Sequence, residues 1–109
     1  MTKFRAIAPD GSTLSFSSKD RSYSHAILSR PTEAHVADSE RPRAWTLAAR
    51  VGRPDLITGA LGEQARLLNS EGTFDRLRRR WTYSPLAEPR FELVVVEVSV
   101  VEPKVRATA

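Results

Sequence analysis

Residues 91–101 read FELVVVEVSVV, and valine occupies every second position from Val94 to Val100. This period of two is typical of a β-strand that buries one face. The opposite face begins apolar at Phe91 and becomes polar at Glu97. Because the first half is apolar on both faces, the stretch predicts a strand in the middle of a sheet.

A β-hairpin is predicted at the start of the chain, over residues 3–18. The sequence PDG at positions 9–11 favours a tight turn, because proline presets φ and glycine accepts the left-handed conformation. A three-residue loop places Phe4 opposite Phe16 on an apolar face, whereas a two-residue loop would pair Phe4 with Ser17. We expect the first register, because a slip by one residue would exchange the two faces.

Two further strands are predicted before the middle of the chain. Tyr23–Arg30 alternates and ends at Pro31, which has no N–H to donate to a ladder. Arg43–Val51 also alternates, and we interpret the polar residues 31–43 before it as a surface loop. The apolar side chains of this fourth strand are expected to share one face: Trp45, Leu47, Ala49 and Val51.

One main helix is predicted from about Pro54 to Asn69, where apolar residues recur at the helical spacing. Proline suits the first turn of a helix. Gly59 and Gly62 each cost about 1 kcal/mol relative to alanine, so we expect a close approach to the sheet there. The helix is expected to cover the valine face of residues 91–101.

Residues 73–84 fit two patterns. As a helix, they place three apolar side chains on one stripe. As a strand, which Trp81–Tyr83 favours, they direct Trp81 inward and Arg78 and Arg80 outward. We favour a strand that starts at about Leu77.

These elements predict a single α+β domain over residues 1–102, with residues 103–109 as a frayed C-terminal tail. The expected architecture is an antiparallel or mixed sheet of five to six strands, with one main helix packed on one face. The expected order is four strands, the helix, a strand or short helix, and a final strand. A chain of 109 residues is long enough to bury one core.

The composition excludes several kinds of chemistry. The chain has no cysteine, so disulfides, thiolate metal sites and thiol catalysis are ruled out. Its two histidines are expected to be unremarkable: His25 partly buried and hydrogen-bonded, and His35 solvated in a loop. We predict no catalytic residue, no metal and no cofactor, and therefore a protein that is not an enzyme. A small hydrolase built on His25 is the weakest alternative.

The apolar runs are short compared with the roughly 20 residues that cross a bilayer. The N-terminus carries Lys3 and Arg5 but lacks the apolar region of a signal peptide. The expectation from the sequence is therefore a cytoplasmic location without membrane association.

The densest charge in the chain is an arginine cluster that precedes Trp81 and Tyr83. Its members are Arg76, Arg78, Arg79 and Arg80. The plain interpretation is a solvated basic face over a tryptophan in the core. As a binding site, the cluster suits an acidic protein partner, and the alternative is nucleic acid, with arginines on phosphates and an aromatic ring on a base. The net charge of +4 is modest for a nucleic-acid-binding domain, so we favour a protein partner. The oligomeric state is left open.

Two segments, FRAIAPDG at residues 4–11 and KDRSYSHAI at residues 19–27, resemble small accessory proteins of actinobacterial phages. In that family a strand with a Pro-Asp-Gly turn precedes a basic-x-Tyr-Thr-His-Ala-Val segment. Here Ser24 replaces the threonine and Ile27 the valine, while Trp45 on a strand before a helix is also similar. The family has no established activity, so no site residue is carried over. The resemblance implies a phage interaction or inhibitor module that acts on a host or phage macromolecule.

Overall fold

The computed structural model describes residues 1–36 and 43–101. Part of the predicted loop, residues 37–42, and the predicted tail, residues 103–109, lie outside the described residues. The elements are β1 (Thr2–Ile7), β2 (Thr13–Ser18), β3 (His25–Pro31), α1 (Glu33–Val36), β4 (Thr46–Val51), the 3-10 turn η1 (Pro54–Leu56), α2 (Ile57–Leu68), β5 (Ser70–Asp75), β6 (Arg80–Pro85) and β7 (Phe91–Val100).

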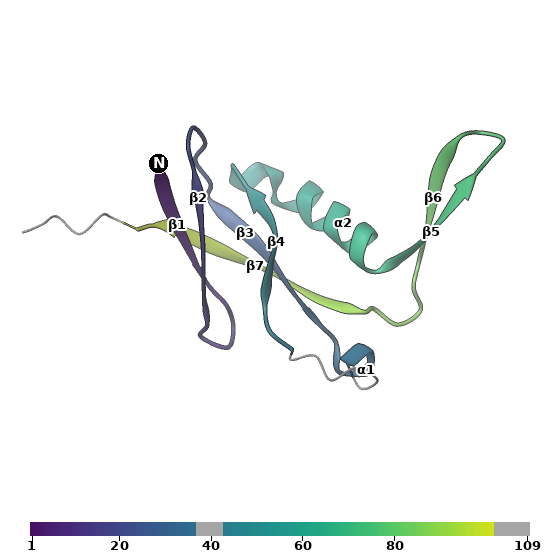
Figure 1. The fold of residues 1–109 in the computed structure, drawn as a ribbon, viewed down its shortest axis with the longest axis horizontal. Helices are drawn as coiled ribbons and strands as arrows, with labels where there is room; N and C mark the ends of the chain where they lie inside the picture. Colours follow the sequence, from purple (N-terminus) through teal and green to yellow (C-terminus); the bar gives the residue numbers. More distant parts are fainter. Residues whose placement is uncertain (37–42, 102–109) are drawn as a thin grey trace, which may run out of the picture.

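A five-stranded antiparallel sheet forms the body of the molecule, with the strand order β2-β1-β7-β3-β4 (Figure 1). The central position predicted for β7 is confirmed. Its first seven residues pair with β3, and its last three pair with β1. This one strand therefore joins the N-terminal hairpin to the rest of the sheet. The predicted α+β class holds in outline, although the structure is mostly β and contains a second sheet.

The predicted register of the N-terminal hairpin is confirmed. Phe4 pairs with Phe16, and the Ala8 N–H donates to the Ser12 carbonyl at 2.9 Å across the three-residue loop. Gly11 takes φ 87, the left-handed conformation that this turn requires. The Asp10 carboxylate accepts hydrogen bonds from both the backbone N–H and the hydroxyl of Ser12.

The predicted single apolar face of the fourth strand is wrong. Ile27 pairs with Ala49, but the next residue, Leu28, pairs with Leu47, so a bulge passes over Ala48. A bulge shifts the alternation by one residue. Leu47 therefore lies on the opposite face of the sheet from Ala49 and Val51.

The main core lies on one face of the sheet, between the N-terminal hairpin and the centre. Phe4 and Phe16 stack with ring centroids 5.3 Å apart, and the ring of Tyr23 meets both of them edge-on. The buried members of this cluster are Phe4, Ala6, Ala8, Phe16, Ala26, Leu28 and Trp45. The valine face of β7 packs against it, partly buried, through Val94, Val96 and Val98.

Helix α2 covers the other face of the sheet, contrary to the prediction. No residue of α2 packs against the Phe4 cluster, yet the helix contacts β4 and β7. The buried Ile27 and Val51 belong to that second face. The helix itself buries no residue fully. The expected close approach at Gly59 and Gly62 is also wrong, because a Cβ at either position would meet nothing within 4 Å.

The ambiguous residues 73–84 form most of a second, two-stranded sheet. Strands β5 and β6 make a hairpin that projects beyond the C-terminal end of α2, away from the main sheet (Figure 1). The predicted strand exists but starts at Arg80. Its partner β5 was not predicted, because it opens on the polar sequence SEG. No helix among the described residues is long and apolar enough to cross a membrane.

Candidate functional site

The four arginines singled out in the sequence lie together at the tip of the β5–β6 hairpin. The last strand pair is Asp75 with Arg80, so residues 76–79 form the loop. The Asp75 Oδ1 atom accepts hydrogen bonds from the backbone N–H groups of Leu77 at 3.0 Å and Arg78 at 3.2 Å. This local turn of the chain, typical of aspartate, presents the arginine side chains to solvent.

The positive charge of this loop is largely uncompensated. Arg78 lies 3.9 Å from the Asp75 carboxylate, and both groups are accessible to water, so the pair is weak. Within the described part of the chain, no carboxylate lies within ion-pairing distance of the other three arginines. All four side chains are exposed. The loop therefore presents a compact basic surface.

One face of the hairpin is aromatic. Phe74 pairs with Trp81, with ring centroids 5.4 Å apart, and Tyr83 pairs with Gly72 on the same face. Trp81 is 58% exposed and Phe74 46% exposed. The prediction of a core tryptophan is thus wrong, because more than half of the Trp81 side chain is open to solvent.

Gly72 lets the two β6 rings lie close to the β5 backbone. A Cβ at this position would stand 3.2 Å from the Cε1 atom of Tyr83 and 3.4 Å from the Cε3 atom of Trp81. Any larger residue would force the rings to move. The glycine therefore helps to hold the rings of Trp81 and Tyr83 against the strand.

The opposite face of the hairpin is polar. It carries the pairs Thr73 with Thr82 and Glu71 with Ser84. The Thr82 hydroxyl donates to the Thr73 carbonyl at 3.2 Å. The hairpin is thus amphipathic, yet its apolar side faces solvent and not the core.

A pocket of about 490 Å³ lies at the root of the hairpin, against the last turn of α2. Its volume falls within the range of small ligand pockets. The guanidinium of Arg66 stands over the Tyr83 ring, 5.1 Å from its centroid, which is a cation–π geometry. The residues that give the pocket its shape are Ala65, Arg66, Ser70, Tyr83, Pro85 and Leu86.

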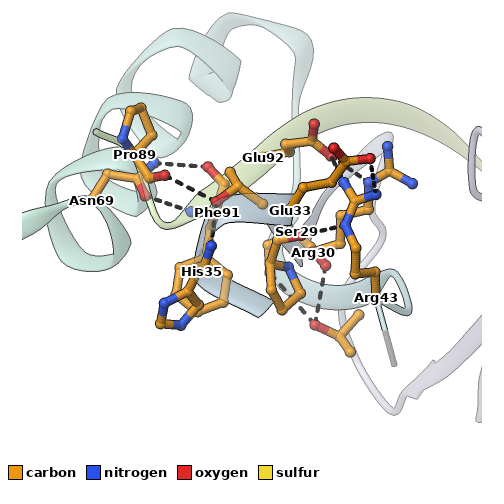
Figure 2. Close-up of polar contacts among 12 residues, drawn as sticks. Ser29, Arg30, Glu33, His35, Arg43, Asn69, Pro89, Phe91 and Glu92 are labelled. Atoms are coloured by element: carbon orange, nitrogen blue, oxygen red, sulfur yellow. Dashed lines mark hydrogen bonds and ion pairs between the residues drawn. The ribbon is translucent and has the colours of Figure 1, made fainter. Parts of the chain in front are cut away.

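Asn69 fixes the root of the hairpin to the main sheet (Figure 2). Its Oδ1 atom accepts hydrogen bonds from the N–H groups of Arg90 and Phe91, both at 2.9 Å, and its Nδ2 donates to the Phe91 carbonyl at 3.0 Å. Its backbone carbonyl accepts from the Leu86 N–H at 2.9 Å. Asn69, which precedes the hairpin, is therefore hydrogen-bonded to residues 86, 90 and 91, which follow it.

A second polar network, also in Figure 2, stabilises the neighbouring end of the sheet. Glu92 accepts hydrogen bonds from Arg30 and from Arg43, the latter at 3.3 Å, and Arg43 also reaches Glu33 at 3.4 Å. The Arg30 guanidinium covers the Trp45 ring, 4.6 Å from its centroid. The two arginines are each paired with a carboxylate, so we assign the network to folding.

The predicted burial of both histidines is confirmed, but His35 lies on helix α1 and not in a loop. His25 is half-buried, with its Nδ1 atom 2.9 Å from the Ser24 hydroxyl, and His35 is exposed on α1. Over residues 1–36 and 43–101, neither imidazole has a carboxylate within 4.0 Å, and no three acidic or imidazole groups are arranged to hold a metal ion.

The sequence pointed to the arginines of the loop but not to Gly72 and Phe74 on the aromatic face or to Arg66 beside it. A signal was present, because Phe74 and Trp81 stand at equal distances from the loop that Asp75 and Arg80 close. If residues 70–85 are interpreted as a hairpin, these equal distances place both rings on one face. The hairpin was not predicted because Trp81 was assumed to point into a core.

Comparisons with protein-family models, curated proteins and solved structures returned no match for this chain. Its function is therefore inferred from the residues of the hairpin and their arrangement.

Proposed function

We propose that the chain is a non-enzymatic interaction module that binds an acidic surface of another protein through the β5–β6 hairpin. The observation that carries this proposal is the exposed aromatic face of Phe74, Trp81 and Tyr83 beside the arginine loop. Tryptophan, tyrosine and arginine are the residue types that contribute most to protein interfaces. Exposed apolar surface of this kind is a common mark of a binding site.

The distribution of charge favours a protein over nucleic acid. The arginines occupy the tip, whereas the strands carry the carboxylates of Glu71 and Asp75. A backbone of repeated phosphates would approach those carboxylates along the length of the hairpin. A protein with a local acidic patch next to apolar residues avoids that repulsion, and its association is accelerated by charge attraction.

A nucleic-acid-binding module is the second candidate. Trp81 is open to solvent next to Arg80, and stacking of a base on an exposed ring near arginines is a common mode of single-strand binding. The exposed position of Trp81 supports nucleic-acid binding more than the sequence did, because the sequence placed this ring in the core. A steep loss of affinity with salt would be its signature.

The identity of the partner class rests on the resemblance to small accessory proteins of actinobacterial phages. On that basis we propose a host or phage protein as the partner and the cytoplasm as the place of action. Interaction with, or inhibition of, that partner is then the role of the chain.

The test is a charge reversal of the loop, Arg78→Glu with Arg80→Glu. The matched control is Arg5→Glu with Arg21→Glu, which changes the net charge equally at two exposed sites away from the hairpin. Both variants are compared with the natural chain for association with proteins from the native host, after nuclease treatment. We expect the loop variant alone to associate more slowly, by at least about tenfold.

Equal behaviour of the two double variants would contradict the role of the loop. Loss of all capture after nuclease treatment, together with a steep salt dependence on a DNA or RNA oligonucleotide, would favour the second candidate.

A further inference from the structure

The aromatic face and the pocket form one continuous surface. Tyr83 belongs to both, because it pairs with Gly72 on the hairpin and lines the pocket at its root. Ser70 and Pro85 pair with each other on the same face and also line the pocket. An apolar strip therefore runs from the last turn of α2 to the arginine loop.

Arg66 is the cation at the inner end of this strip. Among the described residues no carboxylate lies within 4.0 Å of its guanidinium, which rests on the Tyr83 ring. The other strong polar group at this end is the Asn69 amide, whose oxygen and nitrogen are both already hydrogen-bonded to the backbone of residues 90–91. The donors left for a ligand are chiefly those of Arg66, and they select an anion.

The strip thus has positive charge at both ends and aromatic surface between them. Each strand of the hairpin pairs over six residues, from Ser70 to Asp75 on β5. At roughly 3.3 Å per residue, this length is about 17 Å between the first and the last of them. An extended peptide covers the same distance with about five or six residues.

We infer that this surface takes a segment of the partner protein in which acidic residues flank a short apolar run. The apolar run covers Phe74 and Trp81, and one apolar side chain enters the pocket. One acidic end lies beside Arg66 and the other at the arginine loop. This inference rests on the proposed function and specifies the chemistry of the partner.

The experiment is a selection of random twelve-residue peptides displayed on a carrier against the full chain. The consensus peptide is then synthesised with a fluorescent label and titrated with the natural chain and with Arg66→Gln. The matched control is Arg53→Gln, an exposed arginine next to α2 that lies away from the strip. Thermal unfolding of each variant verifies that the fold is retained.

We expect a consensus with acidic residues on both sides of an apolar run of about five residues. We also expect Arg66→Gln to weaken binding of that peptide by about fivefold or more, and Arg53→Gln to leave it unchanged. A consensus without acidic flanks, no enriched peptide, or equal binding by both variants would overturn the inference.

The outcomes also separate this inference from the proposed function. Peptides that bind without acidic flanks, and that lose binding on Trp81→Ser, would overturn the inference and leave the hairpin as the binding element. Peptides that bind irrespective of Trp81→Ser would contradict both. Displacement of the consensus peptide by a single-stranded oligonucleotide at lower concentration would overturn the inference in favour of nucleic acid.

Discussion

Arg79 closes the arginine loop in a conformation that its side chain disfavours. Its φ of 52 lies in the left-handed region, and it is the only residue other than glycine that has a positive φ in the described part of the chain. That conformation costs a residue with a Cβ about 1 kcal/mol or more. Strain of this kind persists where a side chain serves another purpose, which agrees with a binding role for the loop.

Arg79→Gly should therefore stabilise the hairpin locally, by about 1 kcal/mol. The matched control is Arg76→Gly, which removes the same side chain from the same loop without relief of a positive φ. Hydrogen exchange of the β5 and β6 amides is the measurement, because local opening of a projecting hairpin need not alter global unfolding. Slower exchange in Arg79→Gly than in Arg76→Gly is expected, and equal rates would show that the loop is unstrained.

Asn69 is the residue that connects α2, the hairpin root and β7. Replacement by alanine removes all three side-chain hydrogen bonds and leaves the N–H groups of Arg90 and Phe91 without their acceptor. We expect Asn69→Ala to lower the free energy of unfolding by about 1–3 kcal/mol. Urea denaturation followed by circular dichroism measures this, and a loss below about 0.5 kcal/mol would show that water replaces these bonds.

Asp10 gives the N-terminal turn a dependence on pH. Hydrogen bonds from the Ser12 hydroxyl and then from the Ser12 N–H hold the pKa of this carboxyl below its ordinary value of 3.8. A lowered pKa in the folded state means that the ionised group stabilises folding above pH 3.8 and loses this effect as the pH falls through the folded pKa.

Asp10→Ala should therefore reduce the thermal midpoint at neutral pH more than it does in strong acid. Melting curves of the natural chain and the variant, recorded from neutral pH down to about pH 2, test this expectation. A difference between the two chains that stays constant with pH would contradict it.

At the scale of elements, the structure shows which sequence signals were sufficient. The β1–β2 register was predictable, because turn chemistry and the spacing of Phe4 and Phe16 pointed to the same pairing. The bulge in β4 was not, because Ala48 and Ala49 offer no contrast between an inner and an outer face. The β5–β6 hairpin was recognised only in part. Its aromatic residues alternate as in a strand that packs on a core, but no core layer among the described residues lies over Phe74 and Trp81.

The two hairpins of the chain should respond differently to the same substitution. Phe16 is buried and stacked on Phe4, so Phe16→Ala should cost about 3 kcal/mol or more. Phe74 is 46% exposed on the projecting hairpin, so Phe74→Ala should lower global stability far less. Chemical denaturation of both variants decides this, and comparable losses would mean that the projecting hairpin belongs to the folding core.

At the scale of the whole molecule, the core that stabilises the fold and the proposed binding surface lie in different parts. The Phe4 cluster and the strand β7 hold the main sheet together, while the β5–β6 hairpin stands outside it with its apolar face open (Figure 1). Asn69 joins the two parts at the start of β7, next to the Glu92 network of the main sheet (Figure 2). Substitutions on the aromatic face should therefore alter binding without unfolding the sheet.

The affinity of the double variant Phe74→Ser with Trp81→Ser for the captured protein partner tests this claim most directly. We predict that binding weakens by about thirtyfold or more, the effect of losing hot-spot contacts, while the thermal midpoint of the main sheet stays within about 3 °C of the natural chain. Unchanged affinity in a folded double variant would show that the aromatic face of the hairpin is not the binding surface.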